Sequence, residues 1–427
     1  MTPFTAIEDV LDGCCEGKQI GVRGWIYRKR KGKDIVFLVT RDATGTIQCT
    51  VRKDTTSWAD AEKVTIESSV TLSGTVKRDE RAPGGFEVSV DQLKIVGLAE
   101  TFPITKDQSE EFRRNVRHLW IRSRRMNAIM KVRGETLRLV HDFFRKEGFA
   151  EVSPPMFISS ACEGGATLFG LKYFDKDLYL TQSAQLHLEA LIQSLEKVYC
   201  VAPSFRAEKS RTIRHLAEYW HVEAEEAFST MDDLMSLEEN LVGYVCQNIT
   251  KQCGKEFKAL GAKAKTLAKV KPPFSRITYD EAVERLRKKG SRIKWGEDFG
   301  FDEERTLAKE FGPVFVHTYP KKIKAFYCKT YRKKPDLVMS VDLIVPIIGE
   351  LSTGGAREDD KIELLKRLEE FGLRQEDYEW YIDLRRYGTV PHTGFGLGVE
   401  RLLAWMLNLE NIMDTIPFPR TVRRFYP

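Results

Sequence analysis

The sequence contains no apolar run long enough to cross a membrane. About 20 consecutive apolar residues are needed to span a bilayer, and no run in this 427-residue chain approaches that length. Residues 1–19, MTPFTAIEDVLDGCCEGKQ, carry acids and have neither a basic leader nor an apolar core, so we expect no secretory signal. We therefore expect no membrane contact and a cytoplasmic location.

Cysteines at metal-ligand spacing are absent as well. The eight cysteines are scattered, with no CxxC pair and no histidine at ligand spacing. This pattern argues against a zinc site and fits a reduced compartment.

The excess of charge is small. The net charge is +6, and 42% hydrophobic with 30% charged residues is the balance of an ordinary globular protein. Such a charge permits a polyanionic partner without requiring one. The lysine-rich stretch at residues 251–271 is interpreted as a solvated helix and loop.

Residues 18–98 have the pattern of short strands separated by turns. Segments such as DIVFLVT and VTLSGTVKR are rich in β-branched residues, and KGKD, RDATG and the Ala-Pro-Gly-Gly at residues 82–85 are turn signals. Five strands in this length predict a small Greek-key barrel of the kind that binds oligonucleotides. An SH3-like barrel or a purely structural β-domain would fit the same pattern. We assign residues 1–103 to this domain.

The rest of the chain predicts a larger α+β domain. A polar stretch at residues 104–125 has the character of a hinge, and residues 127–146 have apolar positions at helical spacing, which predicts an amphipathic helix. Glycine-bounded strands and helices then alternate irregularly. This favours a mostly antiparallel sheet flanked by helices over residues 126–427, not regular βαβ winding.

One segment of this domain is dense in charge. A strand that leaves a polar loop and returns would place Arg206, Glu208, Tyr219 and Glu223 on one sheet surface. An arginine suits a phosphate because its planar fork stays charged and donates two hydrogen bonds, and a tyrosine ring can stack on a base. A salt-bridged surface hairpin is the structural alternative.

Two further segments complete the pattern. Residues 147–155 run from a helix end into a strand interrupted by prolines, which alone is also typical of an ordinary strand edge. Residues 394–403, GFGLGVERLL, combine alternating glycines, which let a ligand or another backbone approach closely, with the start of a helix at Glu400 and Arg401. The spacing is neither that of a dinucleotide fingerprint nor that of a P-loop. Arg401 is therefore a phosphate-site candidate.

Taken in order, these segments resemble motifs 1, 2 and 3 of the class II aminoacyl-tRNA synthetases. Together with the N-terminal barrel, which then corresponds to an OB-fold, the chain is similar to the aspartyl, asparaginyl and lysyl subgroup over nearly its whole length. Its insertion-free layout is similar to the archaeal and eukaryotic type. The resemblance implies a ligase that uses ATP to form an aminoacyl-adenylate and then loads the 3′ end of tRNA.

The resemblance implies roles in ATP binding. Arg206 would hold the α-phosphate and Arg401 the γ-phosphate, as the two catalytic residues, and Tyr219 would stack on adenine. The other residues that the resemblance places at ATP are Glu208, Arg214, His215 and Glu350. No general base is then required, because the amino-acid carboxylate is itself the nucleophile and catalysis consists of positioning and charge stabilisation.

A metal and a second subunit are implied in the same way. Asp342, Glu350 and Thr353 match positions that bind magnesium, and hard oxygen ligands with substrate phosphates suit Mg²⁺. Pro155 would lie at the interface of a homodimer with an isologous contact.

The resemblance also implies the amino-acid pocket. Residues matching positions around the substrate's ammonium group are Glu163, Ser183, Gln185 and Glu223. Arg357 matches an arginine that contacts the side-chain oxygen of the substrate. Leu188 stands where aspartyl enzymes have a lysine that pairs with the substrate carboxylate, and a buried carboxylate without a cation is costly. Asparagine is therefore the expected substrate and tRNA(Asn) the expected partner.

Residues 352–358, STGGARE, depart from the asparaginyl pattern. Asparaginyl enzymes usually have Gly-Gly-Ser-Gln-Arg-Glu there; the arginine and acid remain, but Thr353 and Ala356 differ. Thr353 falls where aspartyl enzymes often have a metal-binding serine. The alternatives are therefore an aspartate–tRNA ligase, including one that charges both tRNAs, and, more remotely, a synthetase-like RNA-binding protein without ligase activity.

In the barrel, the resemblance implies a site for the anticodon. Phe37 and Gln48 match positions that stack on, and hydrogen-bond to, the central anticodon uridine, and Glu87 matches a third position. Unstacked bases on aromatic side chains are how such barrels bind single strands. From the strand pattern alone, Phe37 would be assigned to the barrel core.

Overall fold

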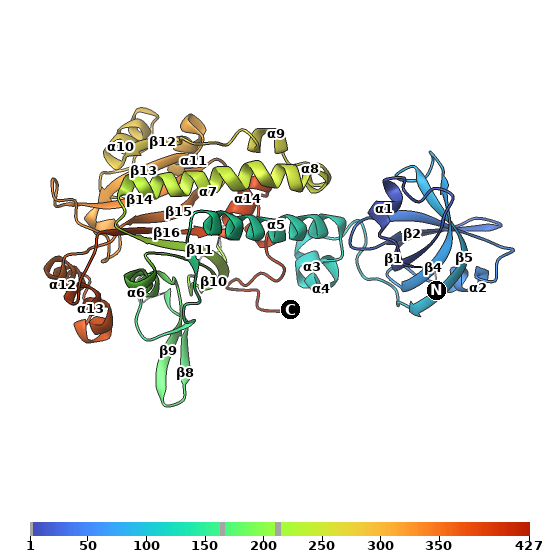
Figure 1. Cartoon of the computed structure of the whole chain (residues 1–427), viewed down its shortest axis with the longest axis horizontal. Coiled ribbons are helices and arrows are strands. Elements are labelled where there is room, and N and C mark those ends of the chain that lie inside the picture. The colour runs from blue at the N-terminus through green and yellow to red at the C-terminus, as the bar shows by residue number, and fades with distance from the viewer. Residues whose placement is uncertain (1–2, 163–166, 210–214) are drawn as a thin grey trace. The chain divides into compact units, whose positions relative to one another are not determined.

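The computed structural model describes residues 3–162, 167–209 and 215–427 (Figure 1). It divides into two compact units, Met1–Arg114 and Asn115–Pro427. The division falls inside the stretch 104–125 that we expected to be a hinge.

The first unit contains the predicted five-stranded barrel. Its closed strand order is β1-β2-β3-β5-β4, and alternation along each strand sends residues such as Val36, Leu38 and Ile47 into a fully buried core. The bounds are β1 (Gln19–Lys31), β2 (Ile35–Arg41), β3 (Thr46–Arg52), β4 (Ser69–Arg78) and β5 (Phe86–Gly97), with the short helices α1 (Ile7–Leu11) and α2 (Trp58–Lys63).

The second unit contains an eight-stranded sheet of order β12-β13-β14-β15-β16-β11-β10-β6. Neighbouring strands are antiparallel except for two parallel pairs, β12–β13 and β10–β6. This confirms the predicted α+β class with a mostly antiparallel sheet. The strands are β6 (Ala150–Glu151), β10 (Lys197–Phe205), β11 (Glu218–Ala227), β12 (Ser275–Thr278), β13 (Val314–Pro320), β14 (Leu337–Val345), β15 (Gly349–Ala356) and β16 (His392–Gly398).

One face of this sheet is covered by three apolar helix faces, from α5 (Arg124–Lys146), α7 (Met231–Gln252) and α14 (Val399–Leu407). Helix α5 contains the predicted amphipathic helix and is capped by Ser123, whose side chain accepts a hydrogen bond from the Met126 backbone N–H. Val222 and Ala224 of β11 point into this core. Because side chains alternate along a strand, their neighbours in β11 face the opposite side of the sheet.

A small sheet of order β7-β9-β8 projects from the unit (Figure 1). Every helix of the described residues is too short or too polar to cross a bilayer. The remaining bounds are α3 (Glu110–Asn115), α4 (Arg117–Trp120), β7 (Phe157–Ile158), β8 (Gly170–Tyr173), β9 (Lys176–Leu180), α6 (Gln185–Leu195), α8 (Gly254–Leu260), α9 (Ala264–Leu267), α10 (Tyr279–Lys288), α11 (Phe301–Phe311), α12 (Lys361–Glu370) and α13 (Glu379–Arg386).

Candidate active site

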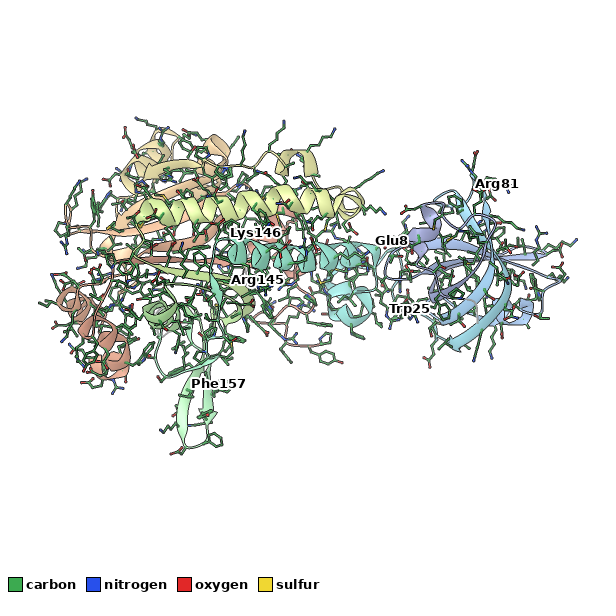
Figure 2. The ribbon with its side chains drawn as sticks, viewed as in Figure 1. Glu8, Trp25, Arg81, Arg145, Lys146 and Phe157 are labelled. Atoms are coloured by element: carbon green, nitrogen blue, oxygen red, sulfur yellow. The ribbon has the colours of Figure 1, made fainter. Side chains whose placement is uncertain are left out.

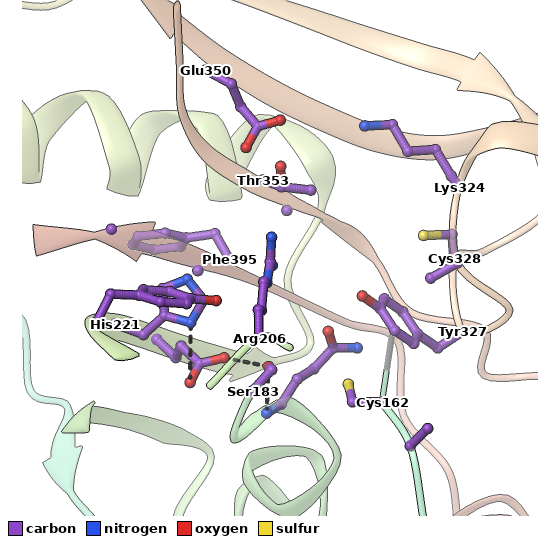
Figure 3. A pocket seen from close by; sticks show the side chains of 18 of the residues that line it. Cys162, Ser183, Arg206, His221, Lys324, Tyr327, Cys328, Glu350, Thr353 and Phe395 are labelled. Atoms are coloured by element: carbon purple, nitrogen blue, oxygen red, sulfur yellow. Dashed lines mark hydrogen bonds and ion pairs between the residues drawn. The ribbon is translucent and has the colours of Figure 1, made fainter. Parts of the chain in front are cut away.

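A cavity of about 510 Å³ lies on the second face of the large sheet (Figure 3). Its walls come from strands β11, β15 and β16, from the start of α6, and from the segment 322–328 between β13 and β14. It therefore gathers segments that are far apart in the sequence.

Strand β11 supplies one wall through its alternation. Tyr219, His221, Glu223 and Glu225 occur at every second position and all line the cavity. Arg206, just beyond the end of β10, also reaches the cavity, because Ser204 of β10 pairs with Tyr219. The expected surface of Arg206, Glu208, Tyr219 and Glu223 is therefore assembled.

Glu223 organises the start of helix α6. Its carboxylate accepts a hydrogen bond from the Ser183 hydroxyl and another from the Ala184 backbone N–H at 2.9 Å (Figure 3). The Gln185 backbone N–H in turn donates to Ser183 Oγ at 3.1 Å. Three of the residues expected around an ammonium group, Ser183, Gln185 and Glu223, thus lie together in one hydrogen-bonded cluster.

Glu225 and Arg357 form what we call the floor of the cavity. The Arg357 Nε donates to Glu225 Oε1 at 3.0 Å, and both side chains are almost fully buried. Burial raises the pKa of Glu225, while the charge of Arg357 opposes that rise. A Cβ at position 394 would lie 2.1 Å from the Glu225 carboxyl carbon, so Gly394 provides the space that this pair occupies.

A second buried charge cluster supports Gln185. Glu189, one helical turn further along α6, accepts hydrogen bonds from Gln185 Nε2 at 3.0 Å, from Tyr381 at 2.8 Å and from Arg385 at 2.6 Å. His392 Nε2 lies 3.0 Å from the same carboxylate. Burial alone would raise the pKa of Glu189, but the charge of Arg385 and the contact with His392 lower it below its ordinary value. Glu189 is therefore a buried anion with its partners in place.

The other end of the cavity, which we call the open end, carries two arginines. The Arg206 guanidinium lies over the Tyr219 ring, 5.6 Å from its centroid. Arg401 Nη1 donates to Glu350 Oε1 at 2.6 Å and to the Glu350 backbone oxygen at 2.9 Å. Burial works to raise the pKa of Glu350, but the positive charge of Arg401 outweighs it, so that pKa is lowered.

Two more expected residues line the open end. Glu208 and His215 both contact the cavity, with His215 Nε2 4.0 Å from a Glu208 oxygen. His221 also lines the cavity, and burial together with the positive charges of Arg206 and Arg401 lowers its pKa to about 3. His221 is therefore neutral at physiological pH and adds no charge to this end.

The expected metal ligands lie on adjacent strands. Asp342 of β14 pairs in register with Thr353 of β15, and Glu350 and Thr353 line the cavity. Asp342 is buried, and its Oδ2 accepts a hydrogen bond from Lys324 Nζ at 2.6 Å, while no described group donates to its Oδ1. The described residues contain no group of three or more His, Cys, Asp or Glu side chains able to hold a metal by themselves. The donor set fits a hard cation that also takes oxygen ligands from a bound phosphate.

Leu188 does not line the cavity. On α6 it shares a face with Ile192 and packs against Val198 and Cys200 of β10, with its side chain fully buried. Gln185 and Glu189 occupy the neighbouring face of the helix, which is directed to the cavity and to α13. The expectation that Leu188 contacts the substrate is therefore not met, because packing on β10 fixes the rotation of the helix.

Three other expected residues lie away from the cavity lining or outside the described residues. Glu163 and Arg214 lie outside the described residues. Pro155 is exposed between β6 and β7. Next to it, the Phe157 side chain is 51% exposed and packs on Tyr173, with ring centroids 5.9 Å apart (Figure 2).

The expected anticodon residues share the outer surface of the barrel. Phe37, Gln48 and Glu87 alternate with core residues and are half-buried. Gln48 Nε2 donates to Glu87 Oε2 at 3.0 Å, and the Arg30 guanidinium covers the Phe37 ring at 4.6 Å. Phe37 is thus not part of the barrel core, contrary to the interpretation from strand pattern alone.

The sequence interpretation missed three groups in or beside the cavity, of which Glu225 and Lys324 line it and Glu189 lies behind Gln185. Glu225 continues the alternation of β11, and this signal could have revealed it. Lys324 comes from the segment before β14, and Glu189 from a helix turn beyond Gln185; neither has a local signal for its partner. All three are ion-paired.

Comparison with known proteins agrees with this geometry. The family model described as tRNA synthetases class II (D, K and N) matches residues 109–422, and that of the OB-fold nucleic acid binding domain matches residues 20–96. The asparagine–tRNA ligase of Thermococcus kodakarensis is 50% identical over 417 residues, covering 96% of this chain and 97% of that protein.

Solved structures show the same similarity. The asparaginyl-tRNA synthetase of Pyrococcus horikoshii, complexed with asparaginyl-adenylate, superposes with a TM-score of 0.94 at 48% identity and covers 97% of both chains. The enzyme of Entamoeba histolytica, also with asparaginyl-adenylate, has a TM-score of 0.89 at 34% identity, covering 97% of this chain and 98% of that one. A family match across most of the chain, a barrel at the N-terminal side and this cavity lead to one conclusion: the chain belongs to the class II tRNA synthetases of the D, K and N group.

Proposed function

We propose that this chain is an asparagine–tRNA ligase, which joins asparagine to the 3′ end of tRNA(Asn) at the expense of ATP. The observation that carries the proposal is the buried pair of Glu225 and Arg357 on the floor of the cavity. The names of the relatives described above point to the same substrate.

The floor offers complementary groups to a side-chain amide. A carboxylate accepts hydrogen bonds and an arginine donates them, whereas an amide does both. Glu225 would accept from the amide nitrogen of asparagine. Arg357 uses Nε and Nη2 on Glu225, and no described residue accepts from its Nη1, which would donate to the amide oxygen.

Aspartate would meet the wrong charge at the same place. Its second carboxylate would lie against Glu225, and like charges brought together in a buried site are strongly unfavourable. Glu225, which lines the cavity, therefore disfavours aspartate, a role that Leu188 cannot fill from its place against β10. Ser183, Gln185 and Glu223 would hold the ammonium group common to both amino acids.

ATP would occupy the open end. Arg206 would contact the α-phosphate and Arg401 the γ-phosphate, while Tyr219 would stack on adenine and Glu208 and His215 would lie close by. A carboxylate oxygen of asparagine attacks the α-phosphorus, the bond from that phosphorus to the bridging oxygen breaks, and pyrophosphate leaves. A hydroxyl of the terminal tRNA ribose then attacks the carbonyl carbon, and AMP leaves. The chain contributes positioning and positive charge.

Magnesium would be held by Glu350, Asp342 and Thr353. The unpartnered Oδ1 of Asp342 is the feature that fits a hard cation best. When bound, Mg²⁺ supplies positive charge to the phosphate oxygens as pyrophosphate departs. Arg401, through its contact with Glu350, keeps that carboxylate ionised and available as a ligand.

Other parts of the proposal concern the whole molecule. The barrel, residues 1–103, would bind the anticodon through Phe37, Gln48 and Glu87, and residues 126–427 would carry out both chemical steps. The exposed segment at Pro155, next to Phe157, would meet a second copy of the chain in a homodimer. The cytoplasm, where tRNA is charged, is the proposed location.

Pyrophosphate exchange tests the substrate directly. Purified protein is given ATP, Mg²⁺, labelled pyrophosphate and one of asparagine, aspartate or lysine. We expect exchange with asparagine and at most trace exchange with the other two. Exchange with aspartate but not with asparagine would overturn the proposal in favour of an aspartate–tRNA ligase.

A further inference from the structure

Residues 251–271 are one of several segments of this chain with a dense positive charge; residues 18–33 and 112–134 are others. Residues 251–271 contain seven lysines and a single glutamate, a net charge of +6. The whole chain also has a net charge of +6. The other residues are therefore neutral in sum, although they include most of the lysines and arginines.

This segment lies at one end of the helical layer (Figure 1). It comprises the C-terminal end of α7, then α8, α9 and the residues that follow, and α8 and α9 both pack near that end of α7 (Figure 1). Phe257 and Leu267 are buried beneath it and fix the two short helices to the core. All seven lysines of the segment are exposed, and we call them the lysine surface.

Most lysines of this surface have no acidic partner among the described residues. Its one acid, Glu256, contacts Lys131 of α5 at 3.7 Å. Six lysines make no ion pair with any residue that the structure describes: Lys251, Lys258, Lys263, Lys265, Lys269 and Lys271. Elsewhere in the same unit, some exposed lysines are paired, as Lys288 is with Glu284 and Lys289 with Glu310, whereas others, such as Lys309 and Lys366, make no ion pair with a described residue.

The usual reasons for surface lysines explain only part of this pattern. Lys251 lies in the last turn of α7 and stabilises the negative end of that helix. Solubility is served by charges of both signs and does not require six unpaired positive charges side by side. A concentrated positive field of this kind attracts a polyanion.

The chemistry of the surface indicates which polyanion. Large exposed hydrophobic side chains are absent from residues 251–271, all of which are described. A membrane-binding surface needs apolar side chains that insert below the headgroups, and the centre of a protein interface is usually aromatic or aliphatic. A phosphate backbone requires only positive charge distributed along it.

We propose that the lysine surface binds the phosphate backbone of tRNA, as a contact additional to the barrel and the cavity. This proposal rests on the proposed function, which makes tRNA the partner. The lysines would read no bases, so they would add affinity and speed of association for any tRNA, while the barrel selects the correct one.

The salt dependence of tRNA binding tests this proposal. Lys258, Lys265 and Lys269 are replaced together by glutamine, and the affinity for unfractionated tRNA is measured by fluorescence anisotropy from 0.05 to 0.3 M salt. Each lost phosphate contact lowers the slope of log affinity against log salt by about 0.7 to 0.9. We expect the slope to fall by about 2 to 3 and the affinity at about 0.1 M salt to fall roughly tenfold or more.

Two controls separate this surface from the rest of the account. Replacing Lys288, Lys289 and Lys334 with glutamine removes three paired lysines of the same unit and should leave the slope unchanged. Pyrophosphate exchange with asparagine involves no tRNA, so the lysine-surface variant should retain the wild-type rate. Loss of exchange in the wild-type protein would defeat the proposed function itself.

Other outcomes overturn the surface proposal alone. If the triple variant exchanges pyrophosphate normally and binds tRNA with the wild-type slope, the surface makes no contact with RNA. Vesicles with one-third phosphatidylserine are tested in parallel by co-sedimentation. A variant that loses vesicle binding but keeps its tRNA affinity would assign the surface to a membrane instead.

Discussion

Each end of the cavity holds a pair of one glutamate and one arginine, but the two pairs differ in how far they are buried. On the floor, Glu225 and Arg357 have side chains that are 1% and 4% exposed, and each is the other's partner. At the open end, Glu350 and Arg401 are 36% and 22% exposed. A buried, completed pair presents a fixed pattern of one acceptor and one donor, whereas a half-exposed pair can rearrange when phosphates or a metal arrive.

The difference indicates a division of labour. Selectivity requires groups whose arrangement does not change with the ligand, because only then does the wrong side chain meet an unfavourable contact. Charge stabilisation during adenylate formation requires groups that can follow the phosphates. The floor should therefore control which amino acid is used, and the open end should control how fast it is activated.

The largest expected effect is at the open end. Arg401→Gln removes a positive donor from the leaving phosphates and should lower the rate of pyrophosphate exchange about 100-fold or more, with little change in the KM for asparagine. Steady-state exchange kinetics measure both values. Arg285→Gln, which breaks a surface pair with Glu310 in the same unit, should change neither. A raised KM for asparagine with an unchanged maximal rate would contradict this division of labour between the two ends of the cavity.

A smaller effect is expected from crowding the floor. In Gly394→Ala, the new methyl group would lie within about 2 Å of the Glu225 carboxylate as it now stands, so the pair must shift. Misplacement on this scale should lower kcat/KM for asparagine by about 10- to 100-fold, while the KM for ATP stays within about twofold of wild type, well under 1 kcal/mol. Gly134→Ala, where no heavy atom lies within 4 Å of the added group, is the matched control. An equally large rise in the KM for ATP would mean that the two ends of the cavity do not act independently.

The barrel should affect neither end of the cavity. Phe37→Ala removes an aromatic side chain on which a base can stack, and the KM for tRNA should rise about tenfold. Exchange of pyrophosphate should stay at the wild-type rate, because that reaction needs no tRNA. Val96→Ala, which shortens an exposed side chain of β5, should leave tRNA charging unchanged. If Phe37→Ala also slowed exchange, Phe37 would be a residue needed for folding.

The smallest effect on activity is expected from a substitution of Glu238, which should change the stability of the protein instead. Glu238 is fully buried like Glu189, but its Oε1 has no hydrogen-bond partner among the described residues, and burial raises its pKa to about 8. Because the folded pKa lies above the unfolded value of 4.5, the protonated form contributes full stability below pH 4.5, and that contribution is lost as the pH rises towards 8.

Glu238→Gln should remove this loss. The difference in the free energy of unfolding between the variant and the wild type should grow in favour of the variant by about 1.4 kcal/mol for each pH unit from 4.5 to 8. The exchange activity should be unchanged. Urea unfolding at a series of pH values measures this difference. A constant difference between the two proteins across that range would show that Glu238 does not titrate in the folded state.

Local patterns in the sequence were sufficient for the barrel, for the amphipathic helix within α5 and for the residues of β11. In each case the spacing of side chains determines which face they share, and the structure keeps that spacing. The resemblance to motifs 2 and 3 likewise predicted that Arg206, Tyr219 and Arg401 share one site, and all three line a single cavity.

The floor of the cavity required tertiary information. Position 188 differs from the aspartyl pattern, but the packing of Leu188 on β10 turns its side chain away from the cavity, and no local signal specifies the rotation of a helix. Glu225 and Arg357 are 132 residues apart in sequence. Their pairing also depends on the missing side chain of Gly394, which belongs to a third segment.

The central claim is that Glu225 selects an amide over a carboxylate. Its most direct test is the ratio of kcat/KM for asparagine to that for aspartate in pyrophosphate exchange, measured for the wild type and for Glu225→Gln. We predict that the wild type strongly favours asparagine. In the variant the ratio should fall at least about tenfold, which corresponds to about 1.4 kcal/mol, in part because kcat/KM for aspartate rises. A variant with lower activity on asparagine but the same ratio would contradict the account.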